Sequence, residues 1–145
     1  MKAVIQRVKQ TALSVDGELI SQIPFGLAVY LGVKVGDTAD KAMQIAKKIA
    51  NMRIFCDSND KMNLSVKDVG GEVLLISQFT LYGDCSHGNR PSFTLAERPD
   101  EACALYNLCA DELRNFGVTV KQGVFGADMK IQQFNDGPVT IIYEI

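Results

Sequence analysis

Residues 72–81, EVLLISQFTL, are the stretch of sequence that decides the fold. The apolar run from Val73 to Ile76 follows a Gly70-Gly71 turn without polar interruption, which is typical of a strand buried on both faces. A second run, LAVYLGV at residues 27–33, has the same character. We therefore predict two buried strands, over 72–81 and 27–33.

Two amphipathic helices are expected to pack on the sheet. The first follows the break at residues 36–38, which supplies an N-cap, and the second begins at Pro99 and ends at Gly117. Apolar residues recur in both at three- and four-residue spacing. The predicted buried faces are Ala42, Ile45, Ile49 and Met52 in the first helix, and Ala102, Leu105, Cys109, Leu113 and Phe116 in the second.

The remaining strands are separated by turn-forming residues. Asp16-Gly17 suits a type I′ turn and predicts a hairpin within residues 11–23, whereas Gly137-Pro138 predicts a turn before the last strand. The polar segment 56–66 predicts a loop. The fold class is then α/β, a single domain over residues 1–145 with a mixed sheet and about two main helices packed on one face. The further strands are 2–8, 11–23, 53–55, 118–122, 129–134 and 139–145.

Composition limits the partners and the compartment. The chain has 145 residues, a net charge of −2 and a sequence pI near 5.3, which argues against a protein that grips a long nucleic-acid backbone. The apolar segment 26–35 is too short and interrupted to cross a bilayer, and Met1-Lys2 leads into a strand pattern rather than a signal sequence. Four cysteines without C-x-x-C spacing indicate reduced thiols. We expect a cytoplasmic protein.

Side-chain catalysts are scarce. His87, in a loop, is the only histidine, so a Ser-His-Asp or Cys-His scheme would depend on that residue, which we interpret as solvated. No spacing typical of a zinc site or a phosphate-binding loop occurs, and Gly32 and Gly36 are interpreted as turn residues. We expect neither a metal nor a cofactor.

Two segments remain as candidates for chemistry. Ser77 and Thr80 follow a buried strand, where either hydroxyl can act as a nucleophile if a base lies nearby or can satisfy buried backbone groups. The segment NDGPVT at 135–140 is either an ordinary turn or a device that presents carbonyl groups, since Gly137 has no side chain and Pro138 has no N–H. Carbonyl oxygens can bind an ammonium group.

Taken together, these segments resemble the D-aminoacyl-tRNA deacylase (D-Tyr-tRNA deacylase) family along nearly the whole chain. The resemblance is carried by SQFTL at 77–81 and the distal GPVT at 137–140. His87 departs from the family pattern, in which a Lys or Arg is more usual at this position. The other matching segments are MKAVIQRVKQTALSVDGE at 1–18, RIFCDSNDKMNLSV at 53–66, GNRPSF at 88–93, FGADM at 125–129 and the rest of NDGPVT.

The resemblance implies the substrate and how its chirality is read. Gly137 and Pro138 would form a cis pair, supported by Arg7, whose carbonyls bind the substrate α-amino group in the partner subunit's pocket and leave no room for an L side chain. D-Aminoacyl-tRNA would then be hydrolysed, as would glycyl-tRNA, including glycine mischarged on tRNA-Ala. Ser77, Gln78, Phe79 and Thr80 would line the pocket for the terminal adenosine and the ester carbonyl.

The resemblance also implies an RNA-assisted reaction in which the 2′-hydroxyl of the terminal ribose contributes to hydrolysis. Backbone N–H groups near Phe79 and Thr80 would form the oxyanion site. The partners implied are the 3′ end of aminoacyl-tRNA and a second copy of the chain in a homodimer with shared sites, with no membrane or DNA. Lys2, Lys9 and Arg90 are candidate local RNA contacts.

Three other interpretations stay open. Thr80 can be the nucleophile of an esterase or amidase acting on another small substrate, or the protein can be a non-catalytic module that binds RNA ends. In the third, a structural dimer without ligand, NDGPVT is only a turn, and the Gly-Pro bond is trans and buried in its own subunit. The apolar strands at 27–33, 72–76 and 138–145 favour a dimer, because two helices cannot cover that much strand surface.

Overall fold

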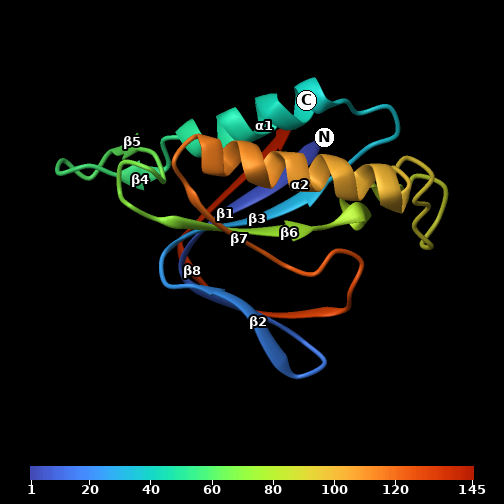
Figure 1. Ribbon diagram of the computed structural model, residues 1–145, viewed down its shortest axis with the longest axis horizontal. Coiled ribbons are helices and arrows are strands. Elements are labelled where there is room, and N and C mark those ends of the chain that lie inside the picture. The colour runs from blue at the N-terminus through green and yellow to red at the C-terminus, as the bar shows by residue number, and fades with distance from the viewer.

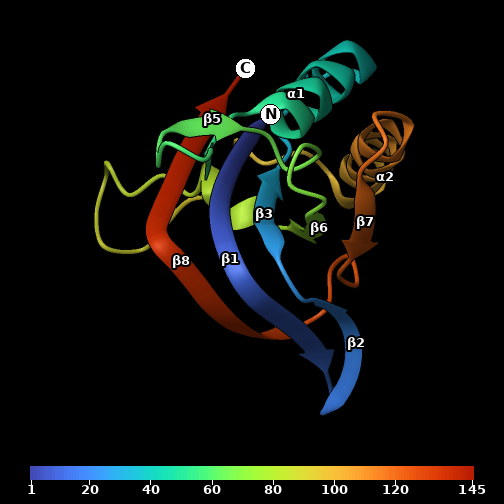
Figure 2. The same ribbon diagram turned by 90° about the vertical axis from the view of Figure 1, so that its left-hand side faces the viewer.

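The computed structural model describes residues 1–145 as a curved sheet with two helices on one of its faces (Figures 1 and 2). The strand order is β2-β1-β3-β6-β7, and β8 pairs with β1. Strands β1, β2, β3 and β8 pair antiparallel, whereas β3-β6 and β6-β7 are parallel, so the predicted mixed sheet is confirmed. The bounds are β1 Lys2–Val15, β2 Glu18–Ile23, β3 Gly26–Gly32, β6 Glu72–Ser77, β7 Thr119–Gln122 and β8 Met129–Glu144.

The two helices are α1, Ala39–Asn51, and α2, Pro99–Asn115. Both pack their apolar faces on the same side of the sheet and form the main core with residues such as Ile5 and Val73. The predicted helices are confirmed, although the Thr38 side chain makes no capping hydrogen bond. Neither helix is long and apolar enough to cross a membrane.

A second, smaller core lies on the other face of the sheet. Strands β1 and β8 are long and curved, and their distal halves bend away from the helices together with β2 (Figure 2). The buried residues of this core are Val8, Leu13, Ile23, Ala28, Leu74 and Ile76. Residues 73–76 are therefore covered on both faces, as the apolar run predicts.

The predicted strand over residues 72–81 is too long. Its regular pairing ends at Ser77, opposite Leu31, because the neighbouring strand β3 ends one residue later. The chain then forms a short 3-10 helix, η1, Phe79–Tyr82. Phe79 and Thr80 thus lie in a helical turn instead of on a strand.

The predicted loop at 56–66 contains a small hairpin. β4, Phe55–Cys56, pairs with β5, Met62–Leu64, and replaces the strand expected at 53–55. The carboxylate of Asp57 accepts hydrogen bonds from the backbone N–H groups of Asn59 and Lys61 and closes the turn. A polar two-stranded ribbon has no apolar alternation, so the sequence pattern does not reveal it.

The turn predicted at Gly137-Pro138 is wrong. β8 runs as one strand from Met129 to Glu144. It lies beside β1, which is also one strand and includes residues 9 and 10, between the two strands predicted there. Gln6 pairs with Thr140 and Val8 with Asn135, so four residues of β8, 136–139, lie opposite the single residue Arg7. The segment is a wide bulge, which we call the 136–139 bulge; it lets two long strands pair on both sides of an irregular insertion. The hairpin predicted at Asp16-Gly17 is confirmed, with both residues at positive φ.

Candidate active site

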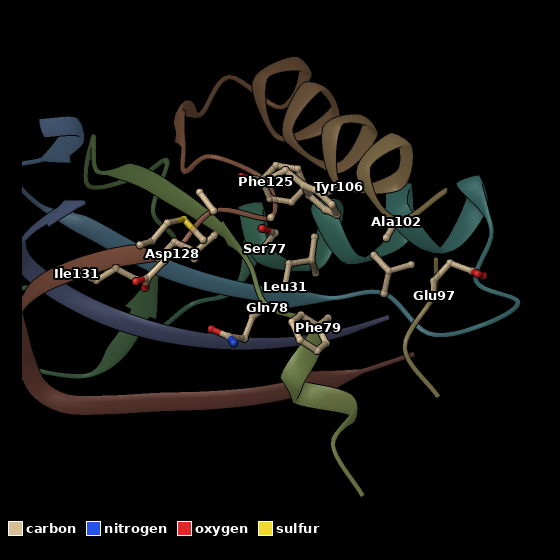
Figure 3. Close-up of a pocket in the computed structure, with 15 residues that line it drawn as sticks. Leu31, Ser77, Gln78, Phe79, Glu97, Ala102, Tyr106, Phe125, Asp128 and Ile131 are labelled. Carbon is tan, nitrogen blue, oxygen red and sulfur yellow. The ribbon is translucent and has the colours of Figure 1, made fainter. Parts of the chain in front are cut away.

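A cavity of about 280 Å³ opens where β6 ends. Ser77, Gln78 and Phe79 line one side of it, and α2 and the segment 125–129 line the other (Figure 3). The cavity therefore lies between the end of a buried strand and a helix. Further lining residues are Leu31, Val33, Glu97, Ala102, Tyr106, Phe125, Asp128, Met129 and Ile131.

The segment Ser77–Thr80 is held by the strand that precedes it. The N–H of Gln78 donates to the carbonyl of Leu31 at 2.8 Å, and the side-chain amide of Gln78 donates to the Thr80 hydroxyl. The N–H groups of Phe79 and Thr80 lie in the first turn of η1, where no intrahelical carbonyl precedes them. These two donors are available for a substrate oxygen.

Thr80 has no base within reach. The only hydrogen-bond partner of its hydroxyl is the Gln78 amide, which cannot accept a proton from it. His87 is exposed in the loop that follows residue 84 and does not line the cavity. Activation of Thr80 as a nucleophile therefore has no support in this geometry.

Aromatic side chains form the wall opposite Ser77. Tyr106 and Phe125 pack with ring centroids 5.8 Å apart, and the Tyr106 hydroxyl donates to the Leu75 carbonyl at 2.8 Å. Burial raises the pKa of Tyr106 to about 12, so this phenol stays neutral and serves packing instead of proton transfer. Phe79, by contrast, is 58% exposed and meets Phe93 edge-on at 5.1 Å. The cavity suits a flat aromatic ring such as a nucleobase.

Two parts of the cavity were not predicted as such: the sequence indicated only a turn at Gly32 and only a family resemblance at residues 125–129. A Cβ on Gly32 would lie 3.0 Å from the Gln78 carbonyl oxygen and 3.2 Å from Leu81 Cβ, so η1 packs on the backbone at this position. Gly32 thus permits a close approach and is not merely a turn residue. The FGADM segment at 125–129, which matches the family pattern, is the sequence feature that indicates the cavity wall opposite Ser77.

The 136–139 bulge is held by Arg7. The guanidinium lies 3.0 Å from the Asp136 carboxylate and also donates to the backbone carbonyls of Asp136, at 3.3 Å, and Ile54, at 2.8 Å. Gly137 has φ +123°, and the Gly137-Pro138 peptide bond is cis. Both residues are exposed, which disagrees with the interpretation of this segment as a turn buried in its own subunit.

Within one chain the bulge and the cavity lie apart. Ser77 is opposite Leu31, Leu31 is opposite Ala3, and Arg7 lies four residues further along β1. From β6 through β3 and β1 to β8 there are three strand spacings, or roughly 14 Å across the sheet. The four residues from Ala3 to Arg7 add roughly 14 Å along the strand. The structure therefore places Ser77, Gln78 and Phe79 in the cavity wall, with Thr80 in the adjoining turn but not among the lining residues. Separately, it brings together Arg7, Gly137 and Pro138.

The other candidate contacts are scattered. Lys2 pairs with Glu144, Lys9 pairs with Asp136, and Arg90 is exposed in the loop before Ser92. All four cysteines are free. No group of three or more His, Cys, Asp or Glu side chains is placed to hold a metal ion.

The family model described as D-Tyr-tRNA(Tyr) deacylase matches residues 4–144. The chain belongs to this family. It is 53% identical to a D-aminoacyl-tRNA deacylase of Bacillus cytotoxicus over 99% of both chains. It is also 51% identical to a D-aminoacyl-tRNA deacylase of Alkaliphilus metalliredigens, over 99% of this chain and 97% of the relative. As a member of the deacylase family the chain is a hydrolase that acts on D-aminoacyl-tRNA.

Two solved structures share the deacylase fold. One, described as a c-Myc DNA unwinding element binding protein, superposes with a TM-score of 0.92 at 41% identity and covers 100% of this chain and 99% of its own. The other, described as a probable eukaryotic D-amino acid tRNA deacylase, has a TM-score of 0.88 over 99% of this chain and 98% of its own. At 17% identity, the latter supports the fold alone.

Proposed function

We propose that this deacylase hydrolyses D-aminoacyl-tRNA and glycyl-tRNA, including glycine mischarged on tRNA-Ala, and rejects L-aminoacyl-tRNA through Gly137-Pro138 of a partner subunit. The observation that carries the proposal is the separation of the two groups of residues within one chain. Neither the cavity beside Ser77 nor the 136–139 bulge, with Gly137 and Pro138 exposed at its tip, makes a complete site alone. A second copy that brings its bulge to the cavity would complete two identical sites.

Selection in this site works by exclusion. The carbonyl oxygens of Gly137 and Pro138 would accept hydrogen bonds from the substrate ammonium group and place the backbone where an L side chain would have to go. Arg7 supports the role of the bulge as a fixed wall. It contacts Asp136 twice and also donates to the carbonyl of Ile54, so it ties the bulge to the segment before β4. A wall made of backbone rejects the wrong enantiomer by steric clash, whereas glycine, which has no side chain, still fits.

The chemistry proposed needs few side chains. Water attacks the ester carbonyl carbon, and the N–H groups of Phe79 and Thr80 stabilise the oxyanion. The bond to the ribose 3′-oxygen then breaks, and the proton lost by the water reaches that oxygen through the neighbouring 2′-hydroxyl. An oxyanion donor is worth about 10²- to 10³-fold in rate. The adenosine would occupy the cavity beside Phe79, with Ser77 and Gln78 in its wall. A contribution of the RNA's own 2′-hydroxyl agrees with the absence of a side-chain base near Thr80.

A homodimer follows from this arrangement. β8 pairs only with β1, and it carries two strongly exposed apolar side chains, Phe134 at 65% and Ile142 at 69% exposure. An unpaired strand edge and exposed apolar residues favour association with a second copy. The cytoplasm, where aminoacyl-tRNA is used, remains the proposed location.

The decisive experiment compares deacylation of D-Tyr-tRNA, Gly-tRNA and L-Tyr-tRNA by the same preparation. We expect turnover of the first two and negligible turnover of the third. Comparable rates on D- and L-Tyr-tRNA would refute the exclusion mechanism. No hydrolysis, with retained binding of RNA ends, would favour the non-catalytic module.

Two further measurements test the chemistry. Thr80→Ala and Ser77→Ala should keep appreciable activity, whereas a tRNA ending in 2′-deoxyadenosine and charged on its 3′-hydroxyl should be a very poor substrate. A trapped acyl-Thr80, or complete loss of activity in a folded Thr80→Ala variant, would support the nucleophile interpretation. Unchanged turnover of the 2′-deoxy substrate would exclude RNA assistance.

Complementation tests the shared site. A chain with a bulky residue at Gly137 should be inactive as a homodimer, and so should a chain in which a bulky residue at Gly32 displaces the backbone of Ser77–Thr80. In a mixed dimer one site inherits both lesions and the other inherits neither, so activity should return at about one site per dimer. Full activity of a monomer, or no recovery on mixing under exchange conditions, would refute the shared site.

A further inference from the structure

The C-terminal end of α1 lies beside the β4-β5 hairpin (Figure 1), and four cations come from this part of the chain. Lys47, Lys48, Arg53 and Lys67 form what we call the α1 basic surface. None of them has a salt bridge, whereas Lys2, Lys41, Lys121 and Lys130 each pair with a carboxylate. A surface depression of about 460 Å³ is lined there by Gln44, Lys47, Lys48, Asn51 and Tyr143.

Neutral groups hold two of these cations in place. The Lys48 Nζ lies 5.5 Å from the centre of the Tyr143 ring, and the Lys67 Nζ donates to the Asn51 side-chain oxygen at 2.8 Å. Asn51 in turn donates to the Lys47 carbonyl at 2.7 Å. These contacts position the ammonium groups without neutralising them.

The surface stays positive despite its neighbouring acids. Asp68 accepts hydrogen bonds from the Ser65 hydroxyl, at 2.7 Å, and from its N–H, at 2.8 Å. These bonds, with smaller contributions from Lys67 and Arg53, lower the pKa of Asp68. Asp136, the acid of the adjoining bulge, is already paired with Arg7 and Lys9. The four cations therefore leave a local excess of positive charge on a protein whose net charge is −2.

The α1 basic surface adjoins the 136–139 bulge. Arg7, which holds the bulge, donates to the carbonyl of Ile54, the residue after Arg53. Lys47 and Lys48 precede Arg53 by about 8 Å along the helix direction. A nucleic acid whose end meets the bulge would therefore pass this surface next.

We propose that the α1 basic surface binds the phosphate backbone of the acceptor stem of the tRNA whose 3′ end occupies the partner subunit's cavity. The inference rests on the proposed shared site. Lysine, arginine, asparagine, glutamine and tyrosine side chains are the usual contacts to phosphate and sugar, and all five types occur here. On the cavity side the cations without a salt bridge are more dispersed: Lys34 and Arg98 lie next to the lining residues Val33 and Glu97, and Arg90 lies in the loop whose Phe93 packs on Phe79.

The test compares two double variants on two substrates. Lys47→Gln with Lys48→Gln removes two charges from the α1 basic surface and keeps helix propensity, and Lys34→Gln with Arg98→Gln removes two from the cavity side. The substrates are D-Tyr-tRNA and D-Tyr esterified to the trinucleotide CCA, which has no stem. Uncharged tRNA and a DNA duplex of acceptor-stem length serve as competitors.

For the Lys47/Lys48 variant on D-Tyr-tRNA we expect kcat/KM to fall about tenfold near 0.1 M salt, because KM rises. The slope of log(kcat/KM) against log[salt] should become shallower by about 2, since two phosphate contacts are lost. Turnover of the trinucleotide ester should be unchanged, which also shows that the variant is folded. An unchanged kcat/KM on D-Tyr-tRNA would overturn the proposal, as would an equal loss on both substrates or a larger loss in the Lys34/Arg98 variant. Equal inhibition by the DNA duplex and uncharged tRNA would overturn the assignment to tRNA. If the wild type hydrolyses neither substrate, the proposed function itself fails.

Discussion

The segment Ser77–Thr80 and the 136–139 bulge would form the two halves of one site, yet they are held in opposite ways. Ser77 ends a strand that is buried on both faces, so the main core sets its position. The bulge lies on an edge strand, and its Gly137 and Pro138 are exposed. Arg7 holds it at Asp136, and Val139 anchors its other end in the main core. The wall of the cavity therefore depends on the packing of β6 in the core and of η1 on Gly32, whereas the proposed selectivity element depends on Arg7 and on Gly137.

The largest effect is expected at Gly137. Gly137→Val forces a side chain into a φ of +123°, with its Cβ about 2.9 Å from Val139 atoms. A displaced bulge should lower kcat/KM on D-Tyr-tRNA by about 100-fold or more. Gly17→Ala is the matched control, because Gly17 also has positive φ but nothing within 4 Å. The measurement is the deacylation rate of each variant, with circular dichroism to confirm that the variant is folded. An active Gly137→Val protein would contradict the role of the bulge.

Arg7 should be next in effect. Arg7→Lys keeps the charge but cannot reach Asp136 and Ile54 together, because lysine has no planar fork. We expect about tenfold lower kcat/KM on D-Tyr-tRNA and a smaller ratio of D to L activity, since a loosened wall discriminates less. Lys9→Ala is the control: Lys9 also faces Asp136, at 3.6 Å, but is 60% exposed. An unchanged D/L ratio in Arg7→Lys would mean that other contacts hold the bulge.

A change behind the cavity should act differently from a change in the bulge. Gly32→Ala places a Cβ 3.0 Å from the Gln78 carbonyl oxygen, so η1 must shift by a few tenths of an ångström. We expect rates on D-Tyr-tRNA and Gly-tRNA to fall together, by roughly tenfold, because reacting groups are misplaced while the wall is intact. The D/L ratio should stay as in the wild type, and a selective change in that ratio would contradict the separation of the two roles.

The smallest effect on activity is expected at Tyr106. Tyr106→Phe loses the buried hydrogen bond from the phenol to the Leu75 carbonyl. That carbonyl still accepts a hydrogen bond from the Gly123 N–H at 3.0 Å, so it is not left without a partner. The free energy of unfolding should therefore fall by only about 1 kcal/mol at neutral pH. Activity should change little.

The pH dependence of stability gives a second readout for Tyr106. Because burial raises the pKa of Tyr106 to about 12, the folded protein keeps a proton that the unfolded chain loses above about pH 10. The resulting stability is present below pH 10 and is lost as the pH rises to about 12, with a slope of up to about 1.4 kcal/mol per pH unit. Urea unfolding at pH 9 to 12 should show the wild type losing its advantage over Tyr106→Phe near pH 11 and becoming the less stable of the two by pH 12. A constant difference would contradict the raised pKa.

The sequence by itself determined the class of fold and the elements that carry it. The buried strands at 27–33 and 72–76 and both helices follow from apolar periodicity, which local spacing records directly. The motifs SQFTL and GPVT also indicate the family, which the match to residues 4–144 confirms. In both cases the information lies in neighbouring residues.

Tertiary structure decided where the motif segments lie. NDGPVT has the composition of a turn, but a long β1 pairs with residues on both sides of it and makes it a bulge opposite Arg7. SQFTL ends its strand at Ser77 because β3 ends beside it, and Gly32 is required because η1 packs on it. Each of these outcomes depends on the length or surface of an element far away in the sequence, which local pattern cannot record.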